Sequence, residues 1–234
     1  MVDTILVTGS NGQLGRSLRA LAEKDQKNQW IFCSRQDLDI TNREKIEQIF
    51  VEHQPTHCIN CAAFTNVRLA EKEPDNARRI NVDGVDNLIE ACNNFDTTLV
   101  HLSTDYVFDG EKSSPYTEDD EVNPLNVYGQ TKAAGEALVA QRAKKGYIVR
   151  SSWVYAEKHG QNFYRSIPAK AKTGEQLEVV NDQTGTPTST SELAHYLLRL
   201  IGQSPSYGIY HFAGDKIQTW FSFAKDILAV HGLG

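Results

Sequence analysis

Tyr128 and Lys132 lie four residues apart and form the residue pair with the clearest chemical meaning in this chain. A helix is expected over residues 126–145, and a spacing of four puts both side chains on one face of it. An ammonium close to a phenol favours the tyrosinate, so we expect Lys132 to lower the pKa of Tyr128. The pair predicts a proton donor or acceptor that works near neutral pH, although the Tyr-x-x-x-Lys spacing alone also arises by chance.

Two hydroxyl side chains precede this pair at the end of an expected strand over residues 98–103. Ser103 and Thr104 stand where that strand ends. A hydroxyl at the carboxyl end of a parallel strand can polarise a carbonyl group bound there. This strand end lies one βαβ step before Tyr128. That context, more than the spacing alone, indicates that the Tyr-x-x-x-Lys pair is functional.

A glycine-rich turn follows the first expected strand, residues 4–8, and precedes an expected helix over 13–24. Gly9, Gly12 and Gly15 are spaced by three, which differs from the common Gly-x-Gly-x-x-Gly fingerprint. The same physics applies, because a tight turn lets a pyrophosphate approach the amino terminus of a helix. We predict nucleotide binding here, with a merely structural turn as the alternative.

Ser34 and Arg35 follow the second expected strand, residues 30–33, where NAD-selective proteins usually carry an acidic residue. A hydroxyl and a guanidinium suit a 2′-phosphate, because arginine donates paired hydrogen bonds to phosphate oxygens. This favours NADPH, with NADH still open because Asp37 and Asp39 are nearby. The alternative is that Arg35 is a solvated loop residue.

Strand-like and helix-like segments alternate through the first two thirds of the chain, which predicts an α/β fold with a Rossmann-like, doubly wound parallel sheet. Apolar runs such as 4–7 and 147–149 agree with a sheet covered on both faces. After Trp153 the alternation of strand-like and helix-like segments becomes irregular. We expect an NAD(P)-binding domain over 1–154 and a smaller C-terminal substrate-binding region over 155–234, parts of which return to the sheet.

Composition restricts the class of protein. The 234 residues carry 24 Lys plus Arg against 30 Asp plus Glu, a formal charge of −6. This acidic balance argues against binding to nucleic acid or to a membrane surface. No apolar run reaches the ~18 residues of a membrane span, and the first residues lack a cationic signal region, so we expect a cytoplasmic protein with small-molecule partners.

Cys58 and Cys61 have the Cys-x-x-Cys spacing that can mark a metal or redox site. They fall in an expected buried strand, where residues three apart point to opposite faces. No second pair completes four ligands. We therefore predict buried reduced thiols and no metal site.

The motifs together resemble the extended short-chain dehydrogenase/reductase family and, within it, the dTDP-4-dehydrorhamnose reductase family. The narrower resemblance depends on blocks that run in order through most of the chain, the most specific being residues 103–110 (Ser-Thr-Asp-Tyr-Val-Phe-Asp-Gly) and 182–188 (Asp-Gln-Thr-Gly-Thr-Pro-Thr). Further blocks are residues 12–15, 37–41, 62–67, 124–129, 150–155 and 162–163.

The resemblance implies roles for individual residues. Tyr128 would donate a proton, Lys132 would hold the nicotinamide ribose, and Thr104 would hydrogen-bond the sugar carbonyl. The pyrophosphate would lie against Asn11, Gly12, Gln13 and Leu14, the adenine beside Asp39 and Ile40, and the nicotinamide along Ala62, Ala63 and Thr65. Trp153 would contact the nucleotide sugar, unless it is only a core residue. Ser103, Thr104 and Tyr128 should converge on one oxygen.

The implied reaction is hydride transfer from NADPH to the C4 keto group of dTDP-4-dehydrorhamnose, giving dTDP-L-rhamnose for polysaccharide synthesis. Two alternatives share much of the pattern: a non-catalytic subunit like the regulatory subunit of methionine adenosyltransferase, and a related nucleotide-sugar reductase or epimerase. Members of the family continue beyond the segment that matches Gly234, so the resemblance implies a substrate region with a further C-terminal part. The oligomeric state stays open, with a homodimer as one alternative.

Overall fold

The centre of the protein is a six-stranded sheet in which all strands are parallel. The structure is a computed structural model and describes residues 2–174 and 176–233. The strand order is β2-β1-β3-β4-β5-β9. These strands are β1 (Thr4–Thr8), β2 (Gln29–Phe32), β3 (His57–Asn60), β4 (Thr98–Thr104), β5 (Gly146–Ser151) and β9 (Gly208–His211). The chain adds strands on one side of β1 and then on the other, so the strand order reverses between β1 and β3.

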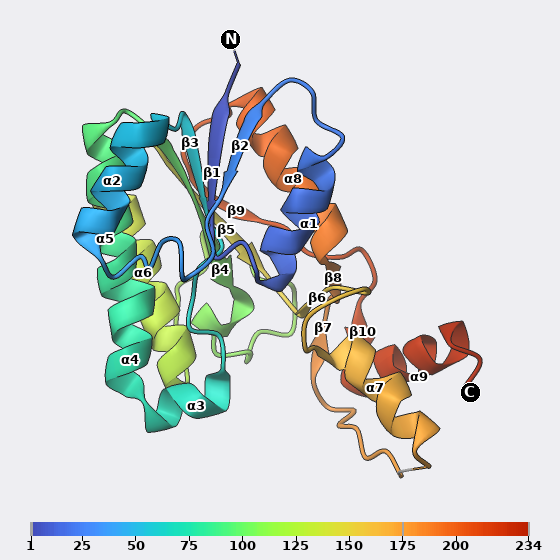
Figure 1. Ribbon diagram of the computed structural model, residues 1–234. Helices are drawn as coiled ribbons and strands as arrows, with labels where there is room; N and C mark the ends of the chain where they lie inside the picture. The colour runs from blue at the N-terminus through green and yellow to red at the C-terminus, as the bar shows by residue number, and fades with distance from the viewer. Residues whose placement is uncertain (1, 175, 234) are drawn as a thin grey trace.

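Helices cover both faces of this sheet, as Figure 1 shows. One face carries α1 (Gln13–Ala22) and α8 (Thr190–Gln203), and the other carries α2 (Arg43–His53), α5 (Gly84–Asn94) and α6 (Val127–Arg142). Each interface has its own apolar core, with Leu6 and Leu99 on the α5 side and Ile5 and Val100 on the α8 side. This alternation along the strands explains the continuous apolar runs and confirms the doubly wound Rossmann-like fold.

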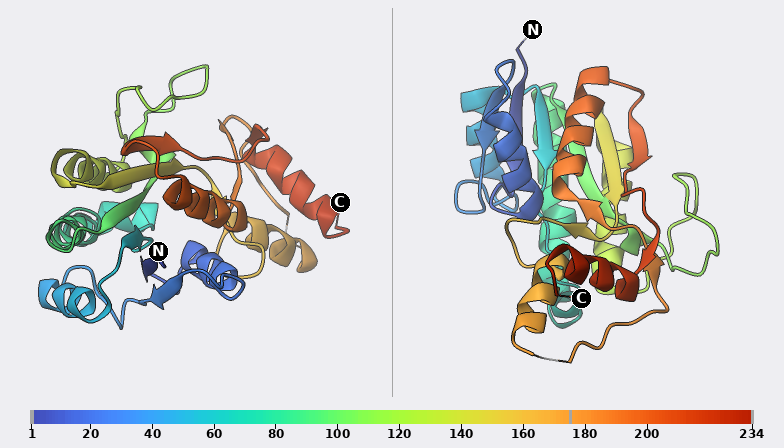
Figure 2. Two further views of the ribbon diagram at one scale, coloured as in Figure 1. Left: turned by 90° about the horizontal axis from the view of Figure 1, so that it is seen from above. Right: turned by 90° about the vertical axis from the view of Figure 1, so that its right-hand side faces the viewer.

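A smaller, aromatic-rich part lies beyond the carboxyl ends of the strands (Figures 1 and 2). It contains α7 (Phe163–Lys172), α9 (Trp220–Val230) and the short strands β6 (Val154–Tyr155), β7 (Thr184–Gly185), β8 (Thr188–Ser189) and β10 (Gln218–Thr219). Its core is built from Ile167, Phe223 and Ile227 with aromatic neighbours. Between these elements the chain returns to the main sheet through α8 and β9. A division near residue 154 remains our proposal.

The helix expected over residues 75–93 is divided into three pieces. It begins as α4 (Pro74–Arg78), widens into a π-helical turn over Arg79–Asp83 and continues as α5. Within this turn Asn81 accepts a hydrogen bond from the Phe64 backbone N–H at 2.8 Å and donates to the Phe64 carbonyl at 3.1 Å. The side chain thereby fixes the loop after β3, which also contains α3 (Val67–Lys72). π-helical turns often occur at functional sites.

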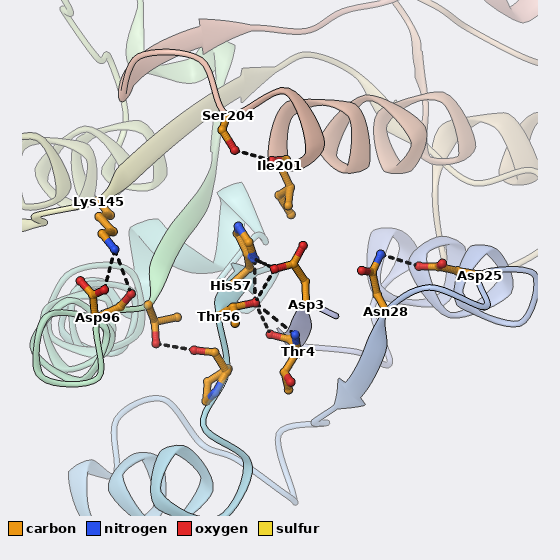
Figure 3. Close-up of polar contacts among 12 residues, drawn as sticks. Asp3, Thr4, Asp25, Asn28, Thr56, His57, Asp96, Lys145, Ile201 and Ser204 are labelled. Atoms are coloured by element: carbon orange, nitrogen blue, oxygen red, sulfur yellow. Dashed lines mark hydrogen bonds and ion pairs between the residues drawn. The ribbon is translucent and has the colours of Figure 1, made fainter. Parts of the chain in front are cut away.

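The amino-terminal edge of the sheet is closed by polar contacts (Figure 3). The Thr56 hydroxyl accepts a hydrogen bond from the Thr4 N–H at 3.1 Å and lies 2.9 Å from His57 Nδ1. An ion pair of 2.7 Å joins Lys145 to Asp96 beside β5. These contacts tie the starts of neighbouring strands together, while the large cavity described below lies at the opposite edge. None of the helices in the described ranges is long and apolar enough to cross a membrane.

Candidate active site

A cavity of about 820 Å³ lies at the carboxyl edge of the sheet, between the sheet and the helices α7 and α9. In open α/β sheets, ligands bind at this edge where the strand order reverses. The cavity brings together all but one of the residues expected to form the site. Those that line it are Gly9, Asn11, Gly12, Gln13, Leu14, Arg35, Asp39, Ile40, Ala62, Ala63, Thr65, Ser103, Thr104, Tyr128, Lys132 and Trp153.

Two glycines of the turn are required by close backbone contacts. Gly9 has φ +61°, and a Cβ there would lie 2.7 Å from the Ala62 nitrogen. A Cβ on Gly15 would lie 2.5 Å from Ser10 Cα. The turn is thus packed against the loop after β3 on one side and against the first turn of α1 on the other, which only glycine allows.

The amino terminus of α1 has the form of an anion site. Gly12 is its N-cap residue and provides no side chain to hydrogen-bond the first N–H groups of the helix. Gln13 and Leu14, which carry the first of these groups, line the cavity together with Asn11 and Gly12, so the residues present fit a pyrophosphate.

The Gln13 side chain also forms hydrogen bonds to the segment that follows β6. Its Oε1 accepts hydrogen bonds from the Ala156 N–H at 3.0 Å and from Asn162 at 2.5 Å. His159 lies 3.0 Å from the Gln13 carbonyl oxygen. Gln13 therefore links the glycine-rich turn to the smaller part of the protein, a role that the motif does not reveal.

Ser34 is the one expected residue that does not line the cavity, and its contact with a 2′-phosphate stays a prediction. It is buried, its hydroxyl accepts from the Gln36 N–H at 3.2 Å, and its N–H donates to Asp37 at 2.9 Å. In the free protein this residue closes a turn. Arg35 does line the cavity, with 71% of its side chain exposed. Among the described residues its ion-pair partner is Asp39 at 3.6 Å, so its guanidinium can meet a phosphate.

Thr104 and Tyr128 meet as expected, but the pKa of Tyr128 moves against expectation. Burial raises this pKa to about 12, and a hydrogen bond with Thr104 only partly opposes the effect. The phenol also packs edge-on against Tyr106, with ring centroids 5.6 Å apart. Because burial dominates, the free site holds Tyr128 protonated at neutral pH.

Lys132 is almost completely buried and points to the sheet. Its Nζ donates to the Leu102 carbonyl at 2.6 Å and lies 3.3 Å from His101 Nε2. Burial lowers the pKa of Lys132 to about 8. The ammonium therefore does not dominate the pKa of Tyr128, which is why the expectation from spacing failed.

Two serine hydroxyls in the cavity wall have no hydrogen-bond partner. Ser103 Oγ and Ser151 Oγ are the buried side-chain oxygens or nitrogens without one among the described residues. They come from the ends of β4 and β5, where Thr104 is aligned with Ser151. Buried unpaired hydroxyls are costly, so these two groups point to a polar ligand.

Trp153 is held between a glycine and a second indole. It has φ +47°, its ring stacks on Trp220 at 3.6 Å, and a Cβ on Gly185 would lie 2.5 Å from that ring. Both tryptophans line the cavity. A non-glycine residue in the left-handed region is strained, and such strain is typical of functional positions.

Sequence reasoning missed several cavity residues. Ser151, Asp105 and Trp220 line the wall. Asp105 accepts a hydrogen bond from Thr104 at 3.0 Å, and burial raises its pKa to about 6. Asp105 directly follows Thr104 and Ser151 ends β5, so both could have been found as strand-end positions, whereas Trp220 is far away in sequence and gave no signal.

The cysteines are free, and three of them are buried as predicted. Cys61 is the exception, because it is only partly buried and lines the cavity. Burial raises its pKa, which keeps it a thiol. Within residues 2–174 and 176–233, no group of three or more His, Cys, Asp or Glu side chains is arranged to hold a metal ion.

Comparisons with known proteins agree with this architecture. The family model of the RmlD substrate binding domain matches residues 3–233. A dTDP-4-dehydrorhamnose reductase from Aggregatibacter actinomycetemcomitans is 40% identical over 225 residues, covering 94% of this chain and 76% of the relative.

Two solved structures are similar throughout. The dTDP-4-dehydrorhamnose reductase of Clostridium acetobutylicum superimposes with a TM-score of 0.94 at 43% identity, covering 98% of this chain and 81% of the other. The same enzyme of Bacillus anthracis, solved in complex with NADP, gives 0.94 at 38% identity and covers 99% of this chain and 82% of the other. On these matches, the chain belongs to the dTDP-4-dehydrorhamnose reductase family.

Proposed function

We propose that this protein reduces the C4 keto group of dTDP-4-dehydrorhamnose to give dTDP-L-rhamnose, with NADPH as the hydride donor. The observation that carries the proposal is that Thr104, Tyr128 and Lys132 line the same cavity as the glycine-rich turn. The relatives and structures compared above are named as reductases, which supports a reductase and not a regulatory subunit.

The residues present fit the cofactor. The uncapped start of α1 suits the pyrophosphate, and the exposed Arg35 suits a 2′-phosphate. Ala62, Ala63 and Thr65 form a largely apolar wall where the nicotinamide would lie. When bound, the reduced nicotinamide supplies a hydride, and the protein supplies orientation and electrostatics.

Tyr128 then acts as the proton donor. Because burial raises its pKa to about 12, the phenol keeps its proton until negative charge develops on the substrate oxygen. The unpaired hydroxyls of Ser103 and Ser151 are hydrogen-bond donors available to polar groups of the sugar. Thr104 donates to Asp105 in the free site, so its hydroxyl must turn from that carboxylate to donate to the sugar carbonyl. Donors fixed in advance stabilise the developing oxyanion at little reorganisation cost.

Trp153 and Trp220 form the wall on the side of the smaller part, where a nucleotide sugar has room to extend. We assign Trp153 to substrate contact and the region from 155 onward mainly to substrate binding. The proposal also includes a cytoplasmic location and is compatible with a homodimer.

The experiment is a stoichiometric assay. Purified protein, NADPH and dTDP-4-dehydro-L-rhamnose are mixed, loss of NADPH absorbance is followed, and the sugar product is identified by NMR. We expect one dTDP-L-rhamnose for each NADPH consumed and almost no turnover by Tyr128→Phe, with unchanged NADPH affinity. NADPH binding without consumption would refute the reductase assignment, and a 6-deoxytalose product would refute the assigned stereochemistry.

A further inference from the structure

The segment that follows β6, residues 156–162, is attached to the first residue of α1. Gln13 Oε1 accepts hydrogen bonds from the Ala156 N–H at 3.0 Å and from Asn162 Nδ2 at 2.5 Å. The Gln13 carbonyl oxygen can only accept, so His159 Nε2 carries a proton and donates to it at 3.0 Å. Within the described residues, all hydrogen bonds between the glycine-rich turn and the smaller part of the protein involve Gln13.

Both side-chain amides of this contact are oriented by backbone groups. The Ala156 N–H can only donate, so the oxygen of the Gln13 amide must face it. Asn162 is the N-cap of α7, and its oxygen accepts from the Arg165 N–H at 3.0 Å. Its NH₂ group is thereby directed at Gln13 and at the Ala156 carbonyl, 2.9 Å away. Turning either amide over would place two donors against each other, so the contact is satisfied in one arrangement.

The beginning of α7 holds the cavity wall formed by Trp153 and Trp220, the tryptophan wall. Phe163 is the first residue of α7, and its ring centroid lies 4.6 Å from that of Trp220. Trp220 in turn stacks on Trp153 at 3.6 Å. All three aromatic residues line the cavity. Direct contacts therefore lead from Gln13 through Asn162 to the tryptophan wall.

We propose that Asn162 is a positioning residue for the reduction, which holds the tryptophan wall in a fixed place relative to the cofactor through its hydrogen bond to Gln13. This role rests on the function proposed above, in which the turn around Gln13 binds the pyrophosphate and Trp153 contacts the nucleotide sugar. The residues that place the cofactor and those that place the substrate are thus joined by a direct bond.

Hydride transfer requires a close and defined approach of the nicotinamide to the keto carbon. A misplacement of about 1 Å can cost about 100-fold in rate. The turn determines where the cofactor lies, and the tryptophan wall determines where the nucleotide sugar lies. The hydrogen bond between Gln13 and Asn162 limits the displacement of one relative to the other, so Asn162 acts through its neighbours on the geometry of the reaction.

A serine substitution separates this role from helix capping. Serine caps a helix about as well as asparagine, because its hydroxyl can accept from the Arg165 N–H. It has no NH₂ group and is too short to reach Gln13, so Asn162→Ser removes the link and keeps the cap. Asn42→Ser is the matched control, since Asn42 caps α2 by accepting from the Lys45 N–H at 3.0 Å and is not among the residues that line the cavity.

The first measurement needs no ligand. Urea unfolding is followed in the wild type, in Asn162→Ser, in Gln13→Met and in the double variant, since methionine keeps the length of Gln13 without its oxygen. We expect each substitution to raise the equilibrium constant of unfolding by about tenfold, and the double variant to stay well below about hundredfold, because both substitutions remove the same hydrogen bond. Effects that simply multiply would show that the bond is absent and would overturn the proposal.

The second measurement is a single turnover in a stopped-flow instrument. Protein loaded with NADPH is mixed with saturating dTDP-4-dehydro-L-rhamnose, and the loss of NADPH absorbance gives an amplitude and a rate constant. Loss of folded protein lowers the amplitude, whereas a misplaced substrate lowers the rate constant. We expect Asn162→Ser and Gln13→Met to keep the amplitude and to lower the rate constant by about tenfold or more, and Asn42→Ser to keep both.

The outcomes separate this role from the proposed function. If the wild type is active and Asn162→Ser has the same rate constant, the positioning role is overturned and the reductase function stands. A rate constant that falls equally in Asn42→Ser would assign the effect to helix capping and overturn the role as well. A wild type that binds NADPH without consuming it would refute the proposed function, and with it a role of Asn162 in reduction, while the unfolding experiment would still report on the bond.

Discussion

Replacing Gly9 by alanine should separate the glycine-rich turn from the loop after β3. Gly9 has φ +61°, and the new Cβ would lie 2.7 Å from the Ala62 nitrogen. A left-handed conformation costs about 1–2 kcal/mol for alanine, and overpacking against an unyielding neighbour costs about 1–3 kcal/mol more. We expect Gly9→Ala to lower the free energy of unfolding by about 2–5 kcal/mol.

Gly110→Ala provides the matched control. Gly110 has φ +80°, but a Cβ there meets nothing within 4 Å. It should therefore show only the conformational cost, about 1–2 kcal/mol. The difference between the two losses in free energy of unfolding measures the steric cost of the contact between the turn and Ala62.

The assay is urea unfolding of both variants without ligand, followed by titration with NADPH. Because Gly9 and Ala62 both line the cavity, we expect Gly9→Ala to lose at least about tenfold in NADPH affinity, and Gly110→Ala to keep it. Equal destabilisation of the two variants, with NADPH affinity unchanged in Gly9→Ala, would refute the view that this contact shapes the nucleotide site.

Three further substitutions test the walls of the cavity. Arg35→Ala should weaken NADPH binding by about tenfold or more and leave NADH binding nearly unchanged, since only NADPH carries the 2′-phosphate; equal effects on both cofactors, measured by fluorescence titration, would contradict its role. Ser151→Ala should keep or slightly raise the free energy of unfolding, because it removes an unpaired buried hydroxyl, yet raise KM for the sugar nucleotide or for NADPH; a clear loss of stability would mean that the hydroxyl is paired in the free protein. Trp220→Ala should raise KM for the sugar nucleotide by freeing Trp153, whereas Trp220→Phe, which keeps an aromatic ring against Trp153, should retain most of the affinity; identical KM values in the two variants would argue against the stack.

Local patterns predicted the sheet and most of the site. The strands are short apolar runs between helical patterns, and the residues that end them, such as Thr104 and Ala62, necessarily gather at one edge of a parallel sheet. The helix over Arg43–His53 follows from a local signal, because Ile46, Ile49 and Phe50 are apolar residues at helical spacing.

What sequence reasoning missed depends on tertiary contacts. The π-helical turn at Arg79–Asp83 contains a side chain that holds the loop around Phe64, and no local pattern predicts it. Helix α7 was not predicted, since Pro168 lies inside it. Trp220 meets Trp153 because both pack against the core of the smaller part, which brings together residues 67 positions apart in the sequence.

The second error of the sequence analysis concerned the pKa values of buried groups. Spacing put Tyr128 and Lys132 on one face, but it could not tell how deeply they are buried. Burial raises the pKa of Tyr128 and lowers that of Lys132, so desolvation outweighs the attraction on which the sequence argument relied. The turn contact of the Ser34 hydroxyl with Gln36 was likewise not visible from the sequence.

Deuteride transfer is the most direct test of the central claim, namely that this cavity reduces a sugar carbonyl with a proton from Tyr128. The protein is incubated with NADPH deuterated at the transferred C4 position and with dTDP-4-dehydro-L-rhamnose, and the product is analysed by NMR and mass spectrometry. We predict dTDP-L-rhamnose with deuterium at C4 of the sugar, formed by the wild type and almost absent with Tyr128→Phe. Product without deuterium at C4, or equal product from Tyr128→Phe, would contradict the account.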